Sequence, residues 1–250
     1  RVCGGQTNAP TTAKKPPASP KATSGIRSRI GALAAHDADP AIGACLVTGE
    51  GKAWAAGADI KEFADFDRAQ GEDLARRGQR NLFNRVEQSR KPVVAAVTGF
   101  ALGGGLELAM AAHVRIASSN ARMGLPEVSL GVIPGYGGTQ RLAQIVGKGK
   151  AMEMVLTAGM IDAASALDCG LVNQVVEPEL LLETAQVLAA KMAKNAPTAM
   201  SAALDSILAG YPKEGYHKEM ARFAQCFETE DFKEGTTAFL EKRKPNFPGK

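Results

Sequence analysis

The sequence is poor in cysteine and in aromatic residues. Its four cysteines, Cys3, Cys45, Cys169 and Cys226, lie far apart and include no pair with the spacing of a zinc site. We therefore expect reduced thiols in a reducing compartment, and no structural metal. Only 5% of the residues are aromatic, with one Trp and three Tyr, so the core must be mostly aliphatic.

Three common motifs for nucleotide binding or hydrolysis are also missing. Gly135-Tyr-Gly137-Gly138 lacks the third glycine of a GxGxxG loop, and Gly147-Lys-Gly-Lys150 lacks the Ser or Thr of a P-loop. No GxSxG elbow occurs, which argues against serine hydrolase chemistry. The net charge of +4 suits a small anionic ligand and is too weak to predict binding of nucleic acid.

The longest apolar run, residues 93–114, has the length of a membrane span. However, Thr98, three consecutive glycines and Glu107 lie inside it. A buried strand, a turn and a short buried helix explain this run better, and we expect no membrane partner. We find no secretory signal, and we expect a protein of the bacterial cytoplasm or of the mitochondrial matrix.

Composition divides the chain into three parts. Residues 1–36 contain four prolines, six Lys or Arg and no acidic residue. This is typical of a poorly ordered basic arm, or of the remnant of an organelle-targeting leader. Residues 37–190 alternate between strand and helix patterns and predict an α/β core, whereas residues 191–250 predict a helical C-terminal region.

Short apolar runs bounded by turn residues predict buried strands at 43–48, 92–98, 114–117 and 171–176. The helical pattern at 72–90 links the first two of these strands, which implies parallel pairing. Further helices are predicted at 180–193, 198–208, 214–227 and 231–242. In the last, Phe232, Phe239 and Leu240 form an apolar stripe that must be buried somewhere.

Two glycine-containing segments follow predicted strands. In Ala55-Ala-Gly-Ala-Asp59, the small residues allow a ligand to approach backbone N–H groups, although a plain tight turn explains the segment equally well. In Ala101-Leu-Gly-Gly-Gly-Leu-Glu107, three glycines stand where a helix begins. Free N–H groups and the positive end of the helix dipole could hold a developing oxyanion there.

Two glutamates lie in apolar surroundings. Glu107 is the single charge of its helix, and a buried carboxylate is costly unless it is paired or protonated. Glu127 follows Pro126 in the apolar loop 125–138. The alternatives are a Glu107 that points out of its helix and a Glu127 that is an ordinary surface acid. If both are buried, their pKa values are pushed apart, which supplies an acid and a base at neutral pH.

These segments, in this order and spacing, resemble the crotonase (enoyl-CoA hydratase/isomerase) superfamily, and within it the short-chain enoyl-CoA hydratases. The resemblance runs from Pro40 to Phe247 and includes residues 149–156, 166–171 and 239–247. It implies an α/β fold, a crotonase-like spiral of ββα units with a helical C-terminal trimerisation region. It also implies an enoyl-CoA hydratase, which adds water to trans-2-enoyl-CoA to give 3-hydroxyacyl-CoA in fatty acid β-oxidation.

The resemblance assigns catalytic roles to individual residues. Ala58 and Gly104 match the two backbone N–H donors to the thioester oxygen. Glu107 and Glu127 match the carboxylate pair that holds the water, and Gly135 matches the glycine turn beside it. No metal or redox cofactor is implied, because coenzyme A is part of the substrate.

The resemblance also implies coenzyme A contacts and a homotrimer or a dimer of trimers. One group lines the adenine and phosphate site, and Asp59 is counted with it although it could cap the next helix instead. A second group lies in the C-terminal helices and often reaches the site of a neighbouring subunit. The two groups are Ala56, Asp59, Ile60 and Lys61, and Phe223, Phe239 and Lys242.

The sequence departs from the family at two places. Members usually open with a strand and an Asn-Arg-Pro segment, whereas this chain has Asn8-Ala-Pro10, which puts the first strand and part of the adenine pocket in doubt. His113 stands where an acid is common, and we expect it to be structural. Two other functions remain open as alternatives. Double-bond isomerisation needs only the second carboxylate, and RNA binding, known in some members, has support only from the basic arm.

Overall fold

The computed structural model describes residues 2–3, 39–49, 53–210 and 214–248. Apart from the short strand at Val2–Cys3, the arm predicted at residues 1–36 lies outside the described residues.

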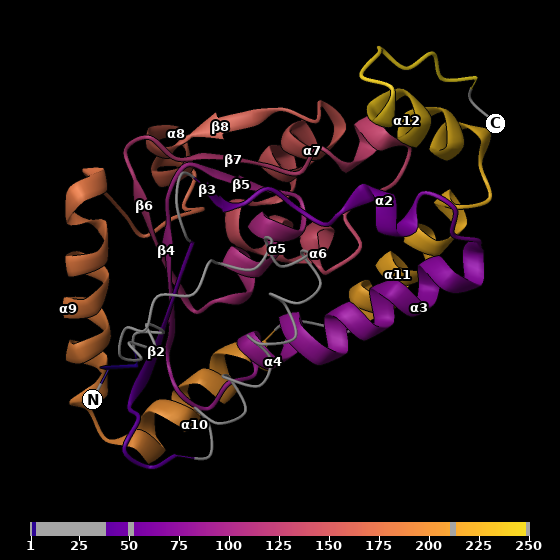
Figure 1. Cartoon of the computed structure of the whole chain (residues 1–250). Coiled ribbons are helices and arrows are strands. Elements are labelled where there is room, and N and C mark those ends of the chain that lie inside the picture. The colour runs from indigo at the N-terminus through magenta and orange to yellow at the C-terminus, as the bar shows by residue number, and fades with distance from the viewer. Residues whose placement is uncertain (1, 4–38, 50–52, 211–213, 249–250) are drawn as a thin grey trace, which may run out of the picture.

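Two sheets form the centre of the molecule (Figure 1). All neighbouring strands of the first sheet are parallel. In sheet order they are β1 (Val2–Cys3), β2 (Ala44–Thr48), β4 (Val93–Val97), β6 (Val114–Ser118) and β9 (Gln174–Val176). In the second sheet β8 is antiparallel to β7 and the other pairs are parallel. Its strands are β3 (Ala53–Ala55), β5 (Phe100–Leu102), β7 (Arg122–Gly124) and β8 (Met160–Asp162).

The chain alternates between the two sheets. β2 and β3, then β4 and β5, then β6 and β7 each place one strand in the first sheet and the next in the second. Helical segments follow each pair. After β3 come α2 (Ile60–Phe63), α3 (Arg68–Gly78), the π-helix η1 (Gln79–Phe83) and α4 (Asn84–Glu87), and after β5 comes α5 (Gly104–Ala111). After β7 come the 3-10 helix η2 (Glu127–Leu130), α6 (Gly138–Val146) and α7 (Lys148–Leu156). This is the predicted spiral of ββα units.

The remaining helices lie toward the C-terminus. They are α8 (Ala163–Asp168), η3 (Pro178–Leu180), α9 (Leu181–Ala193), α10 (Pro197–Leu208), α11 (Glu214–Cys226) and α12 (Glu230–Leu240). The last four agree with the predicted helices to within two residues. The predicted strands are also found, although the last begins at Gln174 rather than at residue 171, and the parallel pairing of the first two is confirmed. The helix predicted at 72–90 begins at Arg68 and includes the π-helix. The second sheet and α6 to α8 were not predicted.

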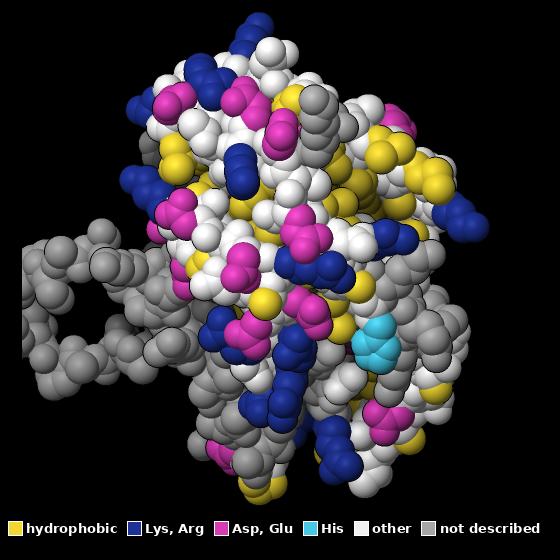
Figure 2. Space-filling view, turned by 90° about the vertical axis from the view of Figure 1, so that its right-hand side faces the viewer, with side chains coloured by type: hydrophobic (Ala, Val, Ile, Leu, Met, Phe, Trp, Pro, Cys, Tyr) yellow, Lys and Arg dark blue, Asp and Glu magenta, His cyan; other side chains and the backbone are white. Residues whose placement is uncertain are grey.

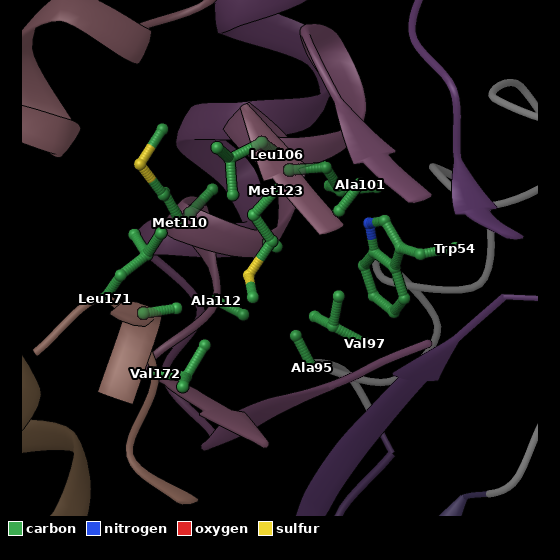
Figure 3. Packing of buried hydrophobic residues seen from close by; sticks show 14 of the residues in the cluster. Trp54, Ala95, Val97, Ala101, Leu106, Met110, Ala112, Met123, Leu171 and Val172 are labelled. Atoms are coloured by element: carbon green, nitrogen blue, oxygen red, sulfur yellow. The ribbon is translucent and has the colours of Figure 1, made fainter. Parts of the chain in front are cut away.

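A mainly aliphatic core fills the space between the sheets, as expected from the few aromatic residues. Figure 3 shows Trp54 pointing from β3 toward Val97 and Ala101, with Leu106 and Met123 nearby. The Trp54 indole Nε1 donates a hydrogen bond to Gly105 O over 2.9 Å, which satisfies its polar atom inside the core.

Helix α9 covers the outer face of the first sheet (Figure 1). Leu181, Ala185 and Ala189 follow one another at every fourth position and are buried against that sheet. The boundary predicted at residue 190 falls inside this helix.

A buried arginine closes the C-terminal end of α5. Arg115 is 7% exposed, and its guanidinium donates to Ala112 O over 2.6 Å and to Leu171 O over 2.8 Å. It thereby satisfies a carbonyl that the helix end leaves without an intrahelical partner. His113 has the predicted structural role, since its Nδ1 accepts from Val93 N and its Nε2–H then donates to Glu87 O.

The face formed by α2, α3, α11 and α12 carries charges of both signs (Figure 2). On α3, Arg76 pairs with Glu72 and Arg77 with Asp73 over 2.9 and 2.7 Å. In the described part of the chain, every helix is too short or too polar to cross a membrane.

Candidate active site

Glycines at the start of α5 allow an unusually close approach of two segments. Gly103 has φ 51° and ψ −126°, a conformation that residues with a side chain rarely adopt. A Cβ atom on Gly105 would lie 2.1 Å from Ala55 O. The end of β3 therefore lies directly on the first turn of α5, and any side chain at residue 105 would push the two apart.

This contact brings the two predicted N–H donors together. A Cβ atom on Gly104 would lie 4.0 Å from Ala58 N. Among the described residues, neither Ala58 N nor Gly104 N donates a hydrogen bond. Because Gly104 is the first residue of α5, its N–H also lies at the positive end of the helix dipole. The pair suits an oxygen atom that gains negative charge.

Glu107 lies one turn further along α5 and is 1% exposed, which excludes the outward-pointing alternative. Its Oε1 accepts hydrogen bonds from Tyr136 N and Gly138 N, each over 2.8 Å. Burial is the main cause that raises the pKa of Glu107 above its usual value, and the charges of Glu127 and Glu219 raise it further. The two backbone N–H groups act in the opposite direction.

Glu127 is the first residue of η2 and faces the same glycine turn. A Cβ atom on Gly103 would lie 2.8 Å from Glu127 Oε1. Glu127 Oε2 is buried and has no hydrogen-bond partner in the described part of the chain. Burial raises the pKa of Glu127 to about 7. This is not the environment of an ordinary surface acid, so that alternative is excluded.

The two carboxylates differ in their hydrogen bonds. Glu107 receives two backbone N–H groups, which favour its charged form, whereas Glu127 Oε2 receives none. These hydrogen bonds favour the charged form of Glu107, whereas its complete burial favours the protonated form and raises its pKa well above the usual value. The two carboxylates therefore titrate as a pair, which can supply one acid and one base at neutral pH.

The turn that holds Glu107 is supported by residues that the sequence analysis missed. Arg141 of α6 is 1% exposed and forms a two-pronged ion pair with Glu87, with both N–O distances 2.8 Å. Its Nη1 donates to Tyr136 O over 2.8 Å. A third glutamate, the buried Glu219 of α11, accepts hydrogen bonds from the same turn.

Sequence signals for these residues existed but were weak. Glu219 shares one face of α11 with Phe223, four residues later, and that face is buried. A charged residue on an apolar stripe is the same signal that identified Glu107. It was harder to see in α11 because the helix is otherwise polar on its other faces.

An aromatic cluster forms one wall beside the donors. The Tyr136 ring stacks on Phe83 with centroids 4.8 Å apart, and a Cβ atom on Gly104 would lie 3.6 Å from it. Phe223 is 6% exposed and packs on Gly135, where a Cβ atom would lie 2.6 Å from its ring. Within this chain, Phe223 therefore supports the turn from inside the core rather than offering an open surface to coenzyme A.

The other positions assigned to coenzyme A lie in two places. Ala56, Asp59 and Lys61 are exposed beside Ala58, and Asp59 caps α2 by accepting from Lys61 N over 3.1 Å. Ile60, the first residue of α2, is partly buried between them. Phe239 and Lys242 are exposed at the end of α12, and the structure does not bring them to the glutamate pair.

The family model described as enoyl-CoA hydratase/isomerase matches residues 25–250. The chain belongs to this family. The match begins before Pro40, so the similarity to the enoyl-CoA hydratase/isomerase family extends further toward the N-terminus than the motifs indicated.

Individual relatives in the enoyl-CoA hydratase/isomerase family cover most of the chain. A short-chain-enoyl-CoA hydratase of Clostridium acetobutylicum is 47% identical, over 82% of this chain and 80% of its own length. A probable enoyl-CoA hydratase of Bacillus subtilis is 44% identical, over 95% and 94%. The crystal structure of an enoyl-CoA hydratase subunit from Geobacillus kaustophilus shares 40% identity and a TM-score of 0.70, over 90% of this chain and 88% of that one.

Proposed function

We propose that the protein is an enoyl-CoA hydratase that catalyses the reversible syn addition of water to trans-2-enoyl-CoA. One observation carries the proposal: the buried Glu107 and the partly buried Glu127, whose Oε2 is buried, lie beside two backbone N–H groups that have no partner in the described chain. Relatives named as enoyl-CoA hydratases support the same activity.

The reaction follows from these groups. The thioester oxygen accepts hydrogen bonds from Ala58 N and Gly104 N, which makes C3 electrophilic. Water attacks C3 while Glu107 takes a proton from it, and the electrons of the double bond move toward C2 and the thioester oxygen. Glu127 then gives its proton to C2. A proton passes from Glu107 to Glu127 to restore the starting state, so the net change is the addition of one water. Coenzyme A is the carrier part of the substrate, and the scheme uses no metal or redox cofactor.

Double-bond isomerisation is the second candidate within the family. It moves a proton at C2 and C4 and needs one carboxylate, so it has no use for a base on the water side. Hydration needs Glu107 as well as Glu127, and two backbone N–H groups hold the Glu107 carboxylate at the same site, which favours hydration.

Two substitutions test the scheme. Glu107→Gln keeps an oxygen that can accept from Tyr136 N and Gly138 N, so the fold should survive while the base is lost. Hydration, followed by the absorbance of the conjugated thioester, should collapse, whereas deuterium exchange at C2 should continue. Glu127→Gln should lose both activities. The double variant should lose far less activity than the two single losses combined, because the pair acts as a unit.

The matched control is Glu153→Gln, which changes an acid that is 61% exposed on α7. It should hydrate enoyl-CoA like the wild type. All variants should still bind acyl-CoA, since neither site glutamate is assigned to the nucleotide. Near-normal hydration by Glu127→Gln would contradict the two-carboxylate mechanism.

The assembly and the pathway are part of the proposal. We propose a homotrimer or a dimer of trimers, because Phe239 and Leu240 of α12 are 55% and 41% exposed and need a covering surface. This would also place Phe239 and Lys242 at the coenzyme A site of a neighbour. Sedimentation as a monomer at micromolar concentration would contradict it. We propose fatty acid β-oxidation as the pathway, and rates on enoyl-CoAs of several chain lengths test that assignment.

RNA binding has no support beyond the arm at residues 1–36, most of which lies outside the described residues. A salt-dependent affinity for RNA that is lost on deleting this arm would favour that function.

A further inference from the structure

Glu219 is a third carboxylate beside the site, and the reaction scheme above does not use it. It is 3% exposed. In the described chain, no Lys or Arg forms a hydrogen bond or ion pair with it. A buried carboxylate without a bonded cation is expensive, so its contacts should explain its presence.

Four donors surround the two oxygens of Glu219. Oε1 accepts from Gln79 Nε2 over 3.1 Å and from Gly137 N over 2.5 Å. Oε2 accepts from Thr139 N over 2.8 Å and from the Thr139 hydroxyl. Each oxygen has two donors, which suits a carboxylate, although burial raises the pKa of Glu219 to about 7.

The turn at residues 136–139 is shared between two carboxylates. The N–H groups of Tyr136 and Gly138 donate to Glu107, and those of Gly137 and Thr139 donate to Glu219. Successive N–H groups thus point in alternate directions, and each direction is held by one glutamate. A change on the Glu219 side must therefore change the orientation of the two groups that hold Glu107.

The turn is also held at its start by the π-helix η1. Gln79 Nε2 donates both to Gly135 O, over 2.9 Å, and to Glu219. The wider turn of a π-helix is often found at functional sites. Here the π-helix places the Gln79 side-chain amide between Gly135 O, at the start of the turn, and the Glu219 carboxylate, which accepts hydrogen bonds from the rest of the turn.

We propose that Glu219 is a positioning residue for the proposed hydratase reaction: it holds the 136–139 turn in the conformation in which Tyr136 N and Gly138 N both donate to Glu107. It does not touch substrate in this scheme. This inference rests on the proposed function for its kinetic consequences, and on the hydrogen bonds of the turn for its structural ones.

The charge of Glu219 has a second, separable effect. The ionisable groups that face it are Glu107, Glu127, Arg141 and Tyr216. Its negative charge raises the pKa of both catalytic candidates, although burial is the larger cause at each. Removing that charge should lower both pKa values, and the whole pH profile of kcat/KM should then move toward lower pH.

Two variants of Glu219 separate position from charge. Glu219→Gln keeps the size but places an NH2 group against a backbone N–H donor, either Gly137 N or Thr139 N, whichever way the amide is turned. We expect kcat to fall by about 10- to 100-fold, as for a misplaced catalytic group, with KM for crotonyl-CoA unchanged and the pH profile moved to lower pH. Glu219→Asp keeps the charge but is shorter, so kcat should fall while the pH profile stays in place.

Hydrogen–deuterium exchange gives a readout that does not need activity. The peptide covering residues 134–142 should exchange faster in both variants than in the wild type, because the Gly137 and Thr139 N–H groups lose partners. The matched control is Glu228→Gln, two residues after the end of α11, whose side chain is 53% exposed. It should match the wild type in rate, pH profile and exchange.

Two results would overturn the proposal. One is a folded Glu219→Gln protein with wild-type kcat. The other is a Glu219→Gln protein that loses kcat but shows neither faster exchange of the turn nor a displaced pH profile, which would indicate general destabilisation. If the wild type itself fails to hydrate enoyl-CoA, the proposed function fails, whereas the exchange measurement still decides whether Glu219 holds the turn.

Discussion

Gly104→Pro removes one proposed oxyanion donor and leaves the rest of the site in place. Gly104 is the first residue of α5, where the N–H has no intrahelical partner and where proline is a favoured residue. A Cβ atom at this position would lie 3.6 Å from the Tyr136 ring, which is ordinary van der Waals contact. The substitution should therefore delete an N–H group without breaking a helix bond.

The expected magnitude comes from the loss of one donor. Removing a single oxyanion-hole hydrogen bond typically costs about 3–4 kcal/mol, or a factor of about 10²–10³ in kcat. Gly104→Ala is the matched control, because it adds the same Cβ atom but keeps the N–H. The ratio of the two kcat values removes any steric effect of the Cβ atom and measures the loss of the N–H together with the proline Cδ that replaces its hydrogen.

The assay is hydration of a short trans-2-enoyl-CoA, followed by loss of the conjugated thioester absorbance. Circular dichroism and urea unfolding establish that both variants are folded. If the folded proline variant is as active as the alanine variant, Gly104 N–H does not belong to the oxyanion site, and the reasoning about the glycine turn is wrong.

Two further predictions concern stability. Arg115→Met should lower the free energy of unfolding by about 2–4 kcal/mol, because Ala112 O and Leu171 O would be buried without a partner; urea unfolding checks this, and the exposed Arg85→Met should change little. Glu127 has a pKa raised from 4.5 to about 7 by burial, so the folded state binds more protons between these pH values and wild-type stability should fall as pH rises through them. Glu127→Gln should therefore gain more stability relative to the wild type at pH 8 than at pH 5, and equal differences at the two pH values would contradict this.

The three central strands of the first sheet, β2, β4 and β6, could be predicted because each is a mainly apolar run of five residues. The strands of the second sheet were missed since three residues, as in β5 (Phe100–Leu102), are too few to show a period. Their place is decided by pairing with strands from other turns of the spiral, which no local pattern contains. The helices after residue 180 were predictable from their length and their apolar stripes.

Glu107 and Glu127 could be identified because a carboxylate in an apolar segment conflicts with burial, and that conflict is visible in the sequence. Their hydrogen bonds were not, since the partners lie on a turn about 30 residues from Glu107 in the chain. Glu219 is further still, 82 residues from Gly137. Its role depends on α11 packing against the turn.

The sequence by itself determined the types of group available: small residues where backbone N–H groups are needed, and glutamates where apolar surroundings change their protonation. Tertiary structure decided which of these groups meet. Ala58 N and Gly104 N lie close together because β3 rests on α5 at Gly105, where a side chain would collide with Ala55 O. This close contact depends on how two distant segments pack together, and neither segment determines it by its own sequence. The sequence therefore shows the glycine but not which atoms lie against it.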